Sequence, residues 1–100
     1  MAIEISDSVL HKMRVKHGGI TKEDVVECFA NRDSSRLMLV DQREDNQTDP
    51  QTLWFISETN NGRRLKVVFI QFIQEKKIQI KTCYEANATE IRIYEKYSKK

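Results

Sequence analysis

Residues 52–84 read TLWFISETNNGRRLKVVFIQFIQEKKIQIKTCY, and this stretch decides the fold. Residues 52–58 are rich in β-branched and aromatic side chains, and they lead into Asn61-Gly62, a strong hairpin signal. A type I′ turn is expected there, with positive φ at both central residues. Residues 66–73 are apolar at nearly every position, which is typical of a central strand covered on both faces. Residues 77–84 alternate between polar and apolar side chains, so we predict three antiparallel strands in a row.

The predicted meander carries basic side chains at one end. Arg63, Arg64 and Lys66 follow its first turn, and Lys81 would lie close to them on the third strand. Because adjacent residues of a strand point to opposite faces, at most one of the two arginines can face a given site. Cations on the rim of a small sheet are suited to holding a phosphate backbone.

Two helices are expected before the sheet. The first would be capped by Ser6 or Asp7 and would end at the glycine pair after His17. The second would be capped by Thr21, with Asp24 at the position of a capping-box partner. Both carry apolar side chains at helical spacing. These are Val9, Leu10 and Met13 in the first helix and Val25, Val26, Phe29 and Ala30 in the second.

The remaining segments complete the predicted order of elements. Residues 37–40 form a predicted strand, residues 43–51 a polar loop, and Thr89 is expected to cap a final helix. Residues 3–5 could add a short edge strand. Helices followed by a run of strands predict a single α+β domain over residues 1–100. It would have two N-terminal helices, a four-stranded antiparallel sheet and a C-terminal helix.

The composition of the chain limits the classes of function that it can have. The chain has 100 residues and a net charge of +2, but residues 1–50 hold seven Lys/Arg and ten Asp/Glu, whereas residues 51–100 hold ten and five. A basic half favours an anionic partner, either nucleic acid or an acidic protein. The sequence has no long apolar run and no signal-peptide pattern at its start, so the cytoplasm is the expected compartment. Cys28 and Cys83 suit a reducing compartment, and they could form a disulfide only if the fold brought them together.

Motifs for cofactor or metal chemistry are missing from the sequence. It has no Gly-rich phosphate loop, and His11 and His17 are not spaced as metal ligands on one helical face. We therefore expect neither a cofactor nor a metal site. Four acidic side chains lack the spacing of an EF-hand and are interpreted as solvated charges in and beside the polar loop. They are Asp41, Glu44, Asp45 and Asp49.

Three segments, in order, carry a resemblance to a known family. In the first segment, Lys16-His17-Gly18 precedes a Thr-capped helix that contains Val25-Val26-Glu27-Cys28-Phe29. The second is residues 59–69, which read TNNGRRLKVVF. The third is residues 78–86, which are followed by Glu90 and Tyr94. Together they resemble the BrnT-like toxins, small members of the RelE/ParE superfamily of toxin–antitoxin ribonucleases. Similar sequences are sometimes labelled ADP-ribosyl-(dinitrogen reductase) hydrolases, but the chain resembles neither the length nor the metal-binding aspartates of that enzyme.

The resemblance implies RNA cleavage or inhibition of translation, with neutralisation by an antitoxin protein that covers the basic face. Lys16 and Arg63 match the family pattern, and the resemblance implies that they contact phosphate and stabilise charge. Where the family commonly has an arginine on the last strand, this chain has Tyr84, which can donate a hydrogen bond, stack on a base or transfer a proton but supplies no fixed charge. We take these three residues as candidate catalytic residues. The candidate RNA contacts are Arg64, Lys66, Lys81 and His17.

Two other readings stay open from the sequence. The chain could be a non-catalytic module that binds protein or RNA on the same fold, or, less favoured, a hydrolase of a nucleotide-type small molecule. Strict alternation would place Tyr84 on the same strand face as Ile78 and Ile80, half-buried with its hydroxyl at the rim. An exposed edge strand would allow a homodimer or the addition of a partner's strand.

Overall fold

The computed structural model describes residues 2–43 and 48–100. Within these residues the chain forms three helices and five strands. They follow one another as β1 (Ala2–Glu4), α1 (Asp7–Val15), α2 (Lys22–Asn31), β2 (Leu39–Val40), β3 (Thr52–Glu58), β4 (Arg64–Phe72), β5 (Lys77–Glu85) and α3 (Ala88–Tyr97). The α+β class is therefore confirmed. Glu44 and Asp45, two of the acidic residues of the polar loop, lie outside the described residues.

The sheet differs from the predicted one in strand number and type. Its order is β1-β5-β4-β3-β2, and β1 pairs with β5 in parallel, so the sheet is five-stranded and mixed rather than four-stranded and antiparallel. The pairing joins residues 2–4 to residues 77–79, at opposite ends of the sequence. A strand of three residues carries too little periodicity to reveal such a partner.

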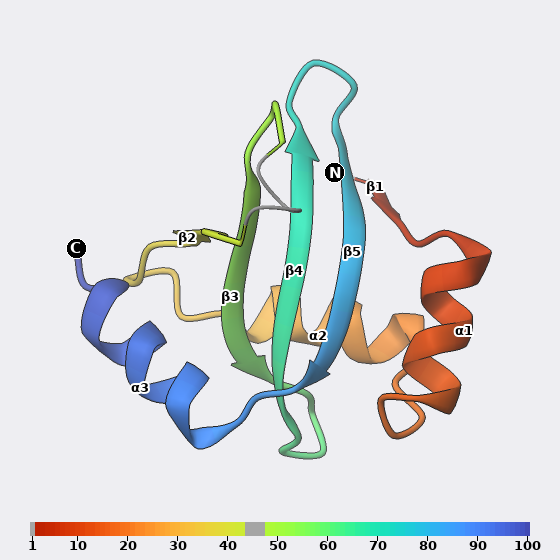
Figure 1. Cartoon of the computed structure of the whole chain (residues 1–100), viewed down its shortest axis with the longest axis horizontal. Helices are drawn as coiled ribbons and strands as arrows, with labels where there is room; N and C mark the ends of the chain where they lie inside the picture. The colour runs from red at the N-terminus through yellow and green to blue at the C-terminus, as the bar shows by residue number, and fades with distance from the viewer. Residues whose placement is uncertain (1, 44–47) are drawn as a thin grey trace.

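The helices lie on both sides of this sheet. In Figure 1, α2 crosses behind the strands, α1 stands beside β5, and α3 lies near β3. The face covered by α1 and α2, here called the helix face, carries Phe55, Val67 and Cys83 from the three central strands. The opposite face, here called the front face, carries Ile56 and Lys66 and is covered in part by α3. β4 is the central strand, buried on both faces as predicted.

A β-bulge on β5 overturns the expected strict alternation. Val68 pairs with Thr82 and Phe69 pairs with Ile80, so Lys81 is an extra residue without a partner in the ladder. A bulge of one residue reverses which face the rest of the strand presents. Ile80 therefore lies on the helix face, whereas Tyr84 lies on the front face opposite it.

Two local predictions are wrong in detail. Gly62 has a φ of +85°, but Asn61 is not among the residues with positive φ, so the hairpin turn is not type I′. The turn closes through a hydrogen bond from the Gly62 N–H to the Thr59 carbonyl, and Gly62 then takes the left-handed position. The last helix is capped by Asn87 rather than Thr89.

The N-terminal helices begin as predicted. Ser6 caps α1 by accepting a hydrogen bond from the Val9 N–H, and Thr21 and Asp24 form a complete capping box on α2. Gly18 and Gly19 both have positive φ, at +79° and +75°, which lets the chain turn sharply between the two helices. No helix in the described part of the chain is long and apolar enough to cross a membrane.

Candidate functional site

Three polar side chains meet on the front face of the sheet. Lys66 on β4 pairs with Tyr84 on β5, so both point to the same side. The Lys66 ammonium donates to Oε2 of Glu90 on α3 at 3.0 Å, and the Tyr84 hydroxyl donates to the same oxygen at 2.7 Å. We call this arrangement the Lys66–Glu90–Tyr84 network. The side chains of Lys66 and Glu90 are only 10% and 16% exposed, so the ion pair is largely shielded from water.

The helix cap fixes the position of the Glu90 carboxylate. Its second oxygen, Oε1, accepts a hydrogen bond from the Asn87 N–H at 3.0 Å, while the Asn87 side chain accepts from the Glu90 N–H. This reciprocal pair is the capping box at the start of α3. The same carboxylate therefore caps a helix and neutralises a lysine on the sheet, and it joins α3 to the front face.

The electrostatics of the network follow from these contacts. Burial acts to raise the pKa of Glu90, but hydrogen bonds from Asn87, Tyr84 and Lys66 outweigh it, and the pKa lies below its usual value. Burial, followed by the hydrogen bond to the Glu90 carboxylate, raises the pKa of Tyr84. The phenol is therefore a neutral hydrogen-bond donor at neutral pH, and the carboxylate is ionised.

Aromatic rings surround the lysine. Its ammonium lies 4.4 Å from the ring centroid of Trp54 and 5.8 Å from that of Tyr84. Both distances are within the range of cation–π attraction. Trp54 is 7% exposed, so the lysine is held over a buried ring, not in open solvent.

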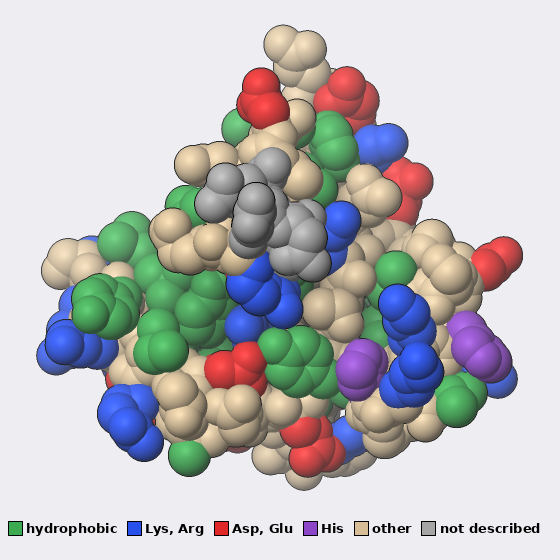
Figure 2. All heavy atoms as spheres, in the orientation of Figure 1, with side chains coloured by type: hydrophobic (Ala, Val, Ile, Leu, Met, Phe, Trp, Pro, Cys, Tyr) green, Lys and Arg blue, Asp and Glu red, His purple; other side chains and the backbone are tan. Residues whose placement is uncertain are grey.

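His17 approaches the network from the turn between α1 and α2. Its ring centroid lies 5.6 Å from that of Tyr84, with the two ring planes tilted by 43°. The chain that follows α1 thus brings an imidazole beside the phenol on the front face. Figure 2 shows basic, acidic, aromatic and histidine side chains gathered near the middle of this face.

A cavity of about 520 Å³ lies next to the network. Trp54 and Lys66 line it from the sheet, Arg43 lines it from the segment after β2, and Ile93 and Tyr97 line it from α3. Its volume is within the range of small-ligand sites. We call it the front cavity.

Asp41 and Arg43 form a second ion pair at the front cavity. The two side chains are 2.8 Å apart, and the Arg43 backbone N–H also donates to the carboxylate. Asp41 is 4% exposed, whereas half of the Arg43 side chain is accessible. The half-exposed Arg43 side chain, paired with Asp41, adds a cation beside an apolar cavity.

Arg63, which the sequence groups with Tyr84 as a catalytic candidate, bonds to the residues that follow His17 and Tyr84 in the chain. The guanidinium of Arg63 donates to the Gly18 carbonyl at 3.2 Å and to Glu85 at 2.8 Å. These contacts hold the turn that carries His17 against the end of β5. Arg63 thus contributes indirectly, by tethering this turn.

The other candidate residues are more scattered. Arg64 is paired with Glu58 at 3.2 Å and lines a different groove, at the outer edge of β3. Lys16 is the exposed C-cap residue of α1. Lys81 is half-buried at the bulge. Of the predicted residues, the structure brings together Lys66, Tyr84 and His17.

Sequence reasoning missed Glu90 and Arg43 as members of the site. Glu90 carries one usable signal, because it stands three residues after Asn87 and so fits a capping box. Its contact with Lys66 joins residues that are far apart in the sequence and has no local signature.

The described residues contain no group of three or more side chains that could hold a metal ion. Cys28 and Cys83 are both free and buried, and burial raises the pKa of the Cys28 thiol to about 12. They are inert core residues. No protein-family model matches this sequence, and no curated protein matches it either.

Proposed function

We propose that this chain is a small toxin-type protein that acts on RNA, as a metal-independent ribonuclease or translation inhibitor, and that a protein antitoxin neutralises it. The observation that carries the proposal is the position of His17 beside Tyr84, with Lys66 in the same network. These are an imidazole, a phenol and an ammonium group on the front face of the sheet.

The chemistry of RNA cleavage without a metal requires these types of group. A base removes the proton of the 2′-hydroxyl, an acid protonates the leaving oxygen, and a cation stabilises the negative charge that develops on the non-bridging oxygens of the phosphorus. His17 supplies an imidazole, the side chain that most often serves as general acid or base in enzymes. The raised pKa of Tyr84 keeps its proton available as a hydrogen-bond donor. Lys66 can supply the positive charge.

Substrate binding must reorganise the network. In the free protein, Lys66 and Tyr84 both donate to Glu90. A phosphate would have to replace the Glu90 carboxylate as their acceptor. The front cavity, with Tyr97 on its wall, would accept the base next to that phosphate. Arg43, at the same cavity, would contact the backbone.

The second candidate is a non-catalytic binding module on the same fold. The observation that favours it is the closure of the network, since Lys66, Tyr84 and Glu90 satisfy one another. In this reading the three side chains hold α3 on the sheet, and the exposed cations bind a partner without chemistry.

The deciding experiment is induced expression in a bacterial host, with growth, total RNA and protein synthesis followed over time. The wild-type chain should arrest growth, and His17→Ala should relieve the arrest. His11→Ala is the matched control, because His11 lies exposed on α1 and should leave the arrest unchanged. Tyr84→Phe keeps the ring but removes the donor, and it should lower activity.

Purified proteins separate catalysis from binding. Cleavage of a labelled single-stranded RNA should persist in excess EDTA and should fall roughly 10²–10⁴-fold in His17→Ala. Circular dichroism must show that each variant is folded. A folded wild-type protein that neither arrests growth nor cleaves RNA would exclude the ribonuclease and leave the binding module.

A further inference from the structure

The outer edge of β3 is paired over only part of its length. β2 covers it through the pairs Leu39–Trp54 and Val40–Leu53, and the Asp41 N–H donates to the Thr52 carbonyl. Because this bond points away from β4, the backbone groups of Thr52 and of every second residue after it face outward. Ile56 and Glu58 therefore direct their N–H groups to the outer edge, beyond the end of β2.

The chain itself explains why the edge is left open. Continuing the β2–β3 register would bring Leu37 opposite Ile56. Instead the Leu37 N–H donates to the Ser98 carbonyl at 2.6 Å, and Arg36 pairs with Lys99. The segment before β2 thus bonds to the C-terminus and does not pair with the β3 edge beyond Trp54, where the Asn31 side chain donates to the Glu58 carbonyl at 2.9 Å.

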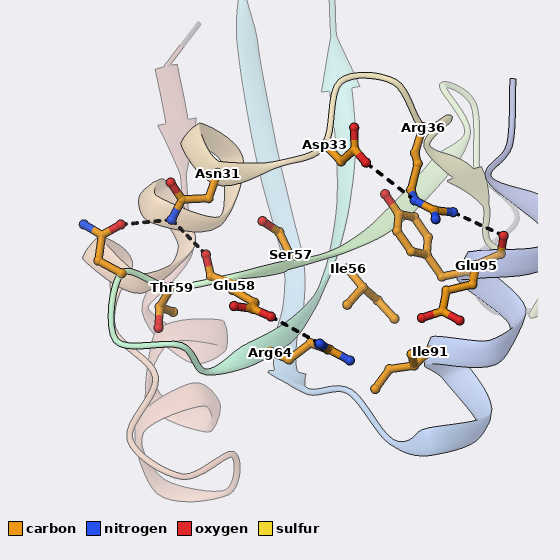
Figure 3. A pocket seen from close by; sticks show the side chains of 12 residues that line it. Asn31, Asp33, Arg36, Ile56, Ser57, Glu58, Thr59, Arg64, Ile91 and Glu95 are labelled. Carbon is orange, nitrogen blue, oxygen red and sulfur yellow. Dashed lines mark hydrogen bonds and ion pairs between the residues drawn. The ribbon is translucent and has the colours of Figure 1, made fainter.

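A groove with a volume of about 790 Å³ follows the uncovered edge. Figure 3 shows Ile56 and Ser57 of β3 between Asn31 at the end of α2 and Ile91 on α3. The volume is within the range of protein binding pockets. The two walls come from different elements, α2 on one side and α3 on the other. We call it the edge groove.

A buried hydroxyl group at the edge groove, that of Ser57, has no hydrogen-bond partner within the described residues. Ser57 is only 8% exposed. Buried hydroxyls in folded proteins nearly always have a partner, and an unpaired one is costly. Unpaired strand groups and an unpaired hydroxyl along one groove both indicate a ligand that carries peptide-like donors and acceptors.

We propose that the edge groove binds an extended segment of a partner protein, which adds to the sheet beside β3. The main chain of this segment would pair with the backbone groups of Ile56 and with the Glu58 N–H. Its side chains would alternate, because successive side chains of a strand point to opposite faces. The set on the front face would be apolar, to pack on Ile56 and Ile91. The other set would be polar, within reach of Ser57. This site is separate from the front cavity and does not depend on the proposed ribonuclease activity.

Proline at position 58 gives a sharp test. The Glu58 N–H faces outward, so Glu58→Pro removes a donor from the edge without breaking a bond to β4. Glu58→Ala is the matched control, since it loses the same ion pair with Arg64 but keeps the N–H. Both variants should remain folded, and circular dichroism and urea unfolding would verify this.

The probe is a phage-displayed library of random linear dodecapeptides, selected on the whole chain. Enriched sequences, made as fluorescent synthetic peptides, should alternate apolar and polar residues. They should bind wild type and Glu58→Ala with equal affinity. Their affinity for Glu58→Pro should be lower, by up to about tenfold. In NMR spectra, bound peptide should slow the hydrogen exchange of the Ile56 and Glu58 amides.

Three results would overturn the proposal. One is a selection without enriched peptides, and another is equal binding to Glu58→Pro and Glu58→Ala. The third is a short oligouridine that perturbs the Ile56 and Glu58 amides when no peptide does so, because the edge groove would then belong to a nucleic acid.

Discussion

At the scale of single residues, Glu90 links the start of α3 to strands β4 and β5, and no local sequence pattern predicts this link. Its carboxylate accepts from a backbone N–H, a phenol and an ammonium group. A partly buried lysine requires such a partner, because an uncompensated charge at this depth would be strongly destabilising. The network is therefore sensitive to the charge of Glu90 as well as to its shape.

Glu90→Gln should change how stability depends on pH. The lowered pKa means that the folded protein binds a proton at Glu90 less readily than the unfolded chain, whose carboxyl group has a pKa near 4.5. The stabilisation is complete above that pH and is lost as the pH falls through the lowered value. Urea unfolding from pH 7 to pH 3 should show wild type losing more stability in acid than Glu90→Gln does.

The matched control for this experiment is Glu75→Gln, in the exposed turn between β4 and β5. It should follow the wild-type curve throughout. If wild type and Glu90→Gln lost equal stability between pH 7 and pH 3, the Glu90 carboxylate would have no net effect on folding.

At the scale of elements, the start of α3 shows what a sequence can specify. Asn87 and Thr89 are both good capping residues, so the residue type alone does not choose between them. The choice follows from Glu90, which stands three residues after Asn87 and completes the capping box. The same rule identified Thr21 and Asp24 correctly at the start of α2.

Replacing each candidate cap by alanine should separate the two. Asn87→Ala removes the acceptor for the Glu90 N–H and should lower the free energy of unfolding by about 1 kcal/mol. Thr89→Ala removes an exposed side chain within the helix and should change it by less than about 0.5 kcal/mol. Chemical denaturation monitored by far-UV circular dichroism measures both. A larger loss for Thr89→Ala would contradict the observed cap.

The bulge on β5 has only a weak signal in the sequence. Polar and apolar residues alternate over residues 77–80, but Lys81 and Thr82 are both polar and Cys83 is apolar, which shifts the alternation by one residue. The bulge is a property of the pairing with β4, where Val68 and Phe69 face Thr82 and Ile80. Relative to Ile80, this insertion places Tyr84 on the opposite face, in the candidate site and not in the core under α1 and α2.

Deleting Lys81 should therefore be tolerated, because Ile80 and Thr82 would become neighbours and already lie on opposite faces of β5. Cys83 and Tyr84 would keep the faces that they have in the wild type. We expect a folded product by size-exclusion chromatography and circular dichroism. Lys81→Ala keeps the bulge, is the matched control and should also fold normally. An unfolded deletion variant beside a folded Lys81→Ala would show that the sheet needs the bulge itself.

At the scale of the whole molecule, local order was predictable and long-range assembly was not. Hydrophobic spacing located the helices and the central strands, because these patterns repeat within a few residues. The parallel pairing of β1 with β5, the contact of Lys66 with Glu90 and that of Arg63 with Gly18 all join distant segments. Such contacts depend on the packed fold, so no local pattern could show that Lys66 bonds to Glu90 or that Arg63 bonds to Gly18.

The C-terminus provides the last whole-molecule contact. Ser98 is fully buried, its carbonyl accepts from the Leu37 N–H, and its hydroxyl accepts from Arg36 at 2.9 Å. These bonds hold the end of α3 to the segment before β2, while Glu90 holds the beginning of α3 to the sheet. Both ends of α3 are therefore tied to parts of the chain that are distant in sequence.

Truncation after Tyr97 should loosen this end of α3 and lower the free energy of unfolding by about 1–3 kcal/mol, because the hydrogen bonds of Ser98 to Leu37, Arg36 and Tyr94 are lost. A chain that ends at Lys99 is the matched control. It loses only the exposed hydrogen bond from Lys100 to the Ser34 carbonyl and should stay close to wild type. Thermal and urea unfolding of the three chains measures the difference. If the two truncations were equally stable, Ser98 would have no part in holding α3, and the open edge of β3 would need another cause than the diversion of Leu37 to the C-terminus.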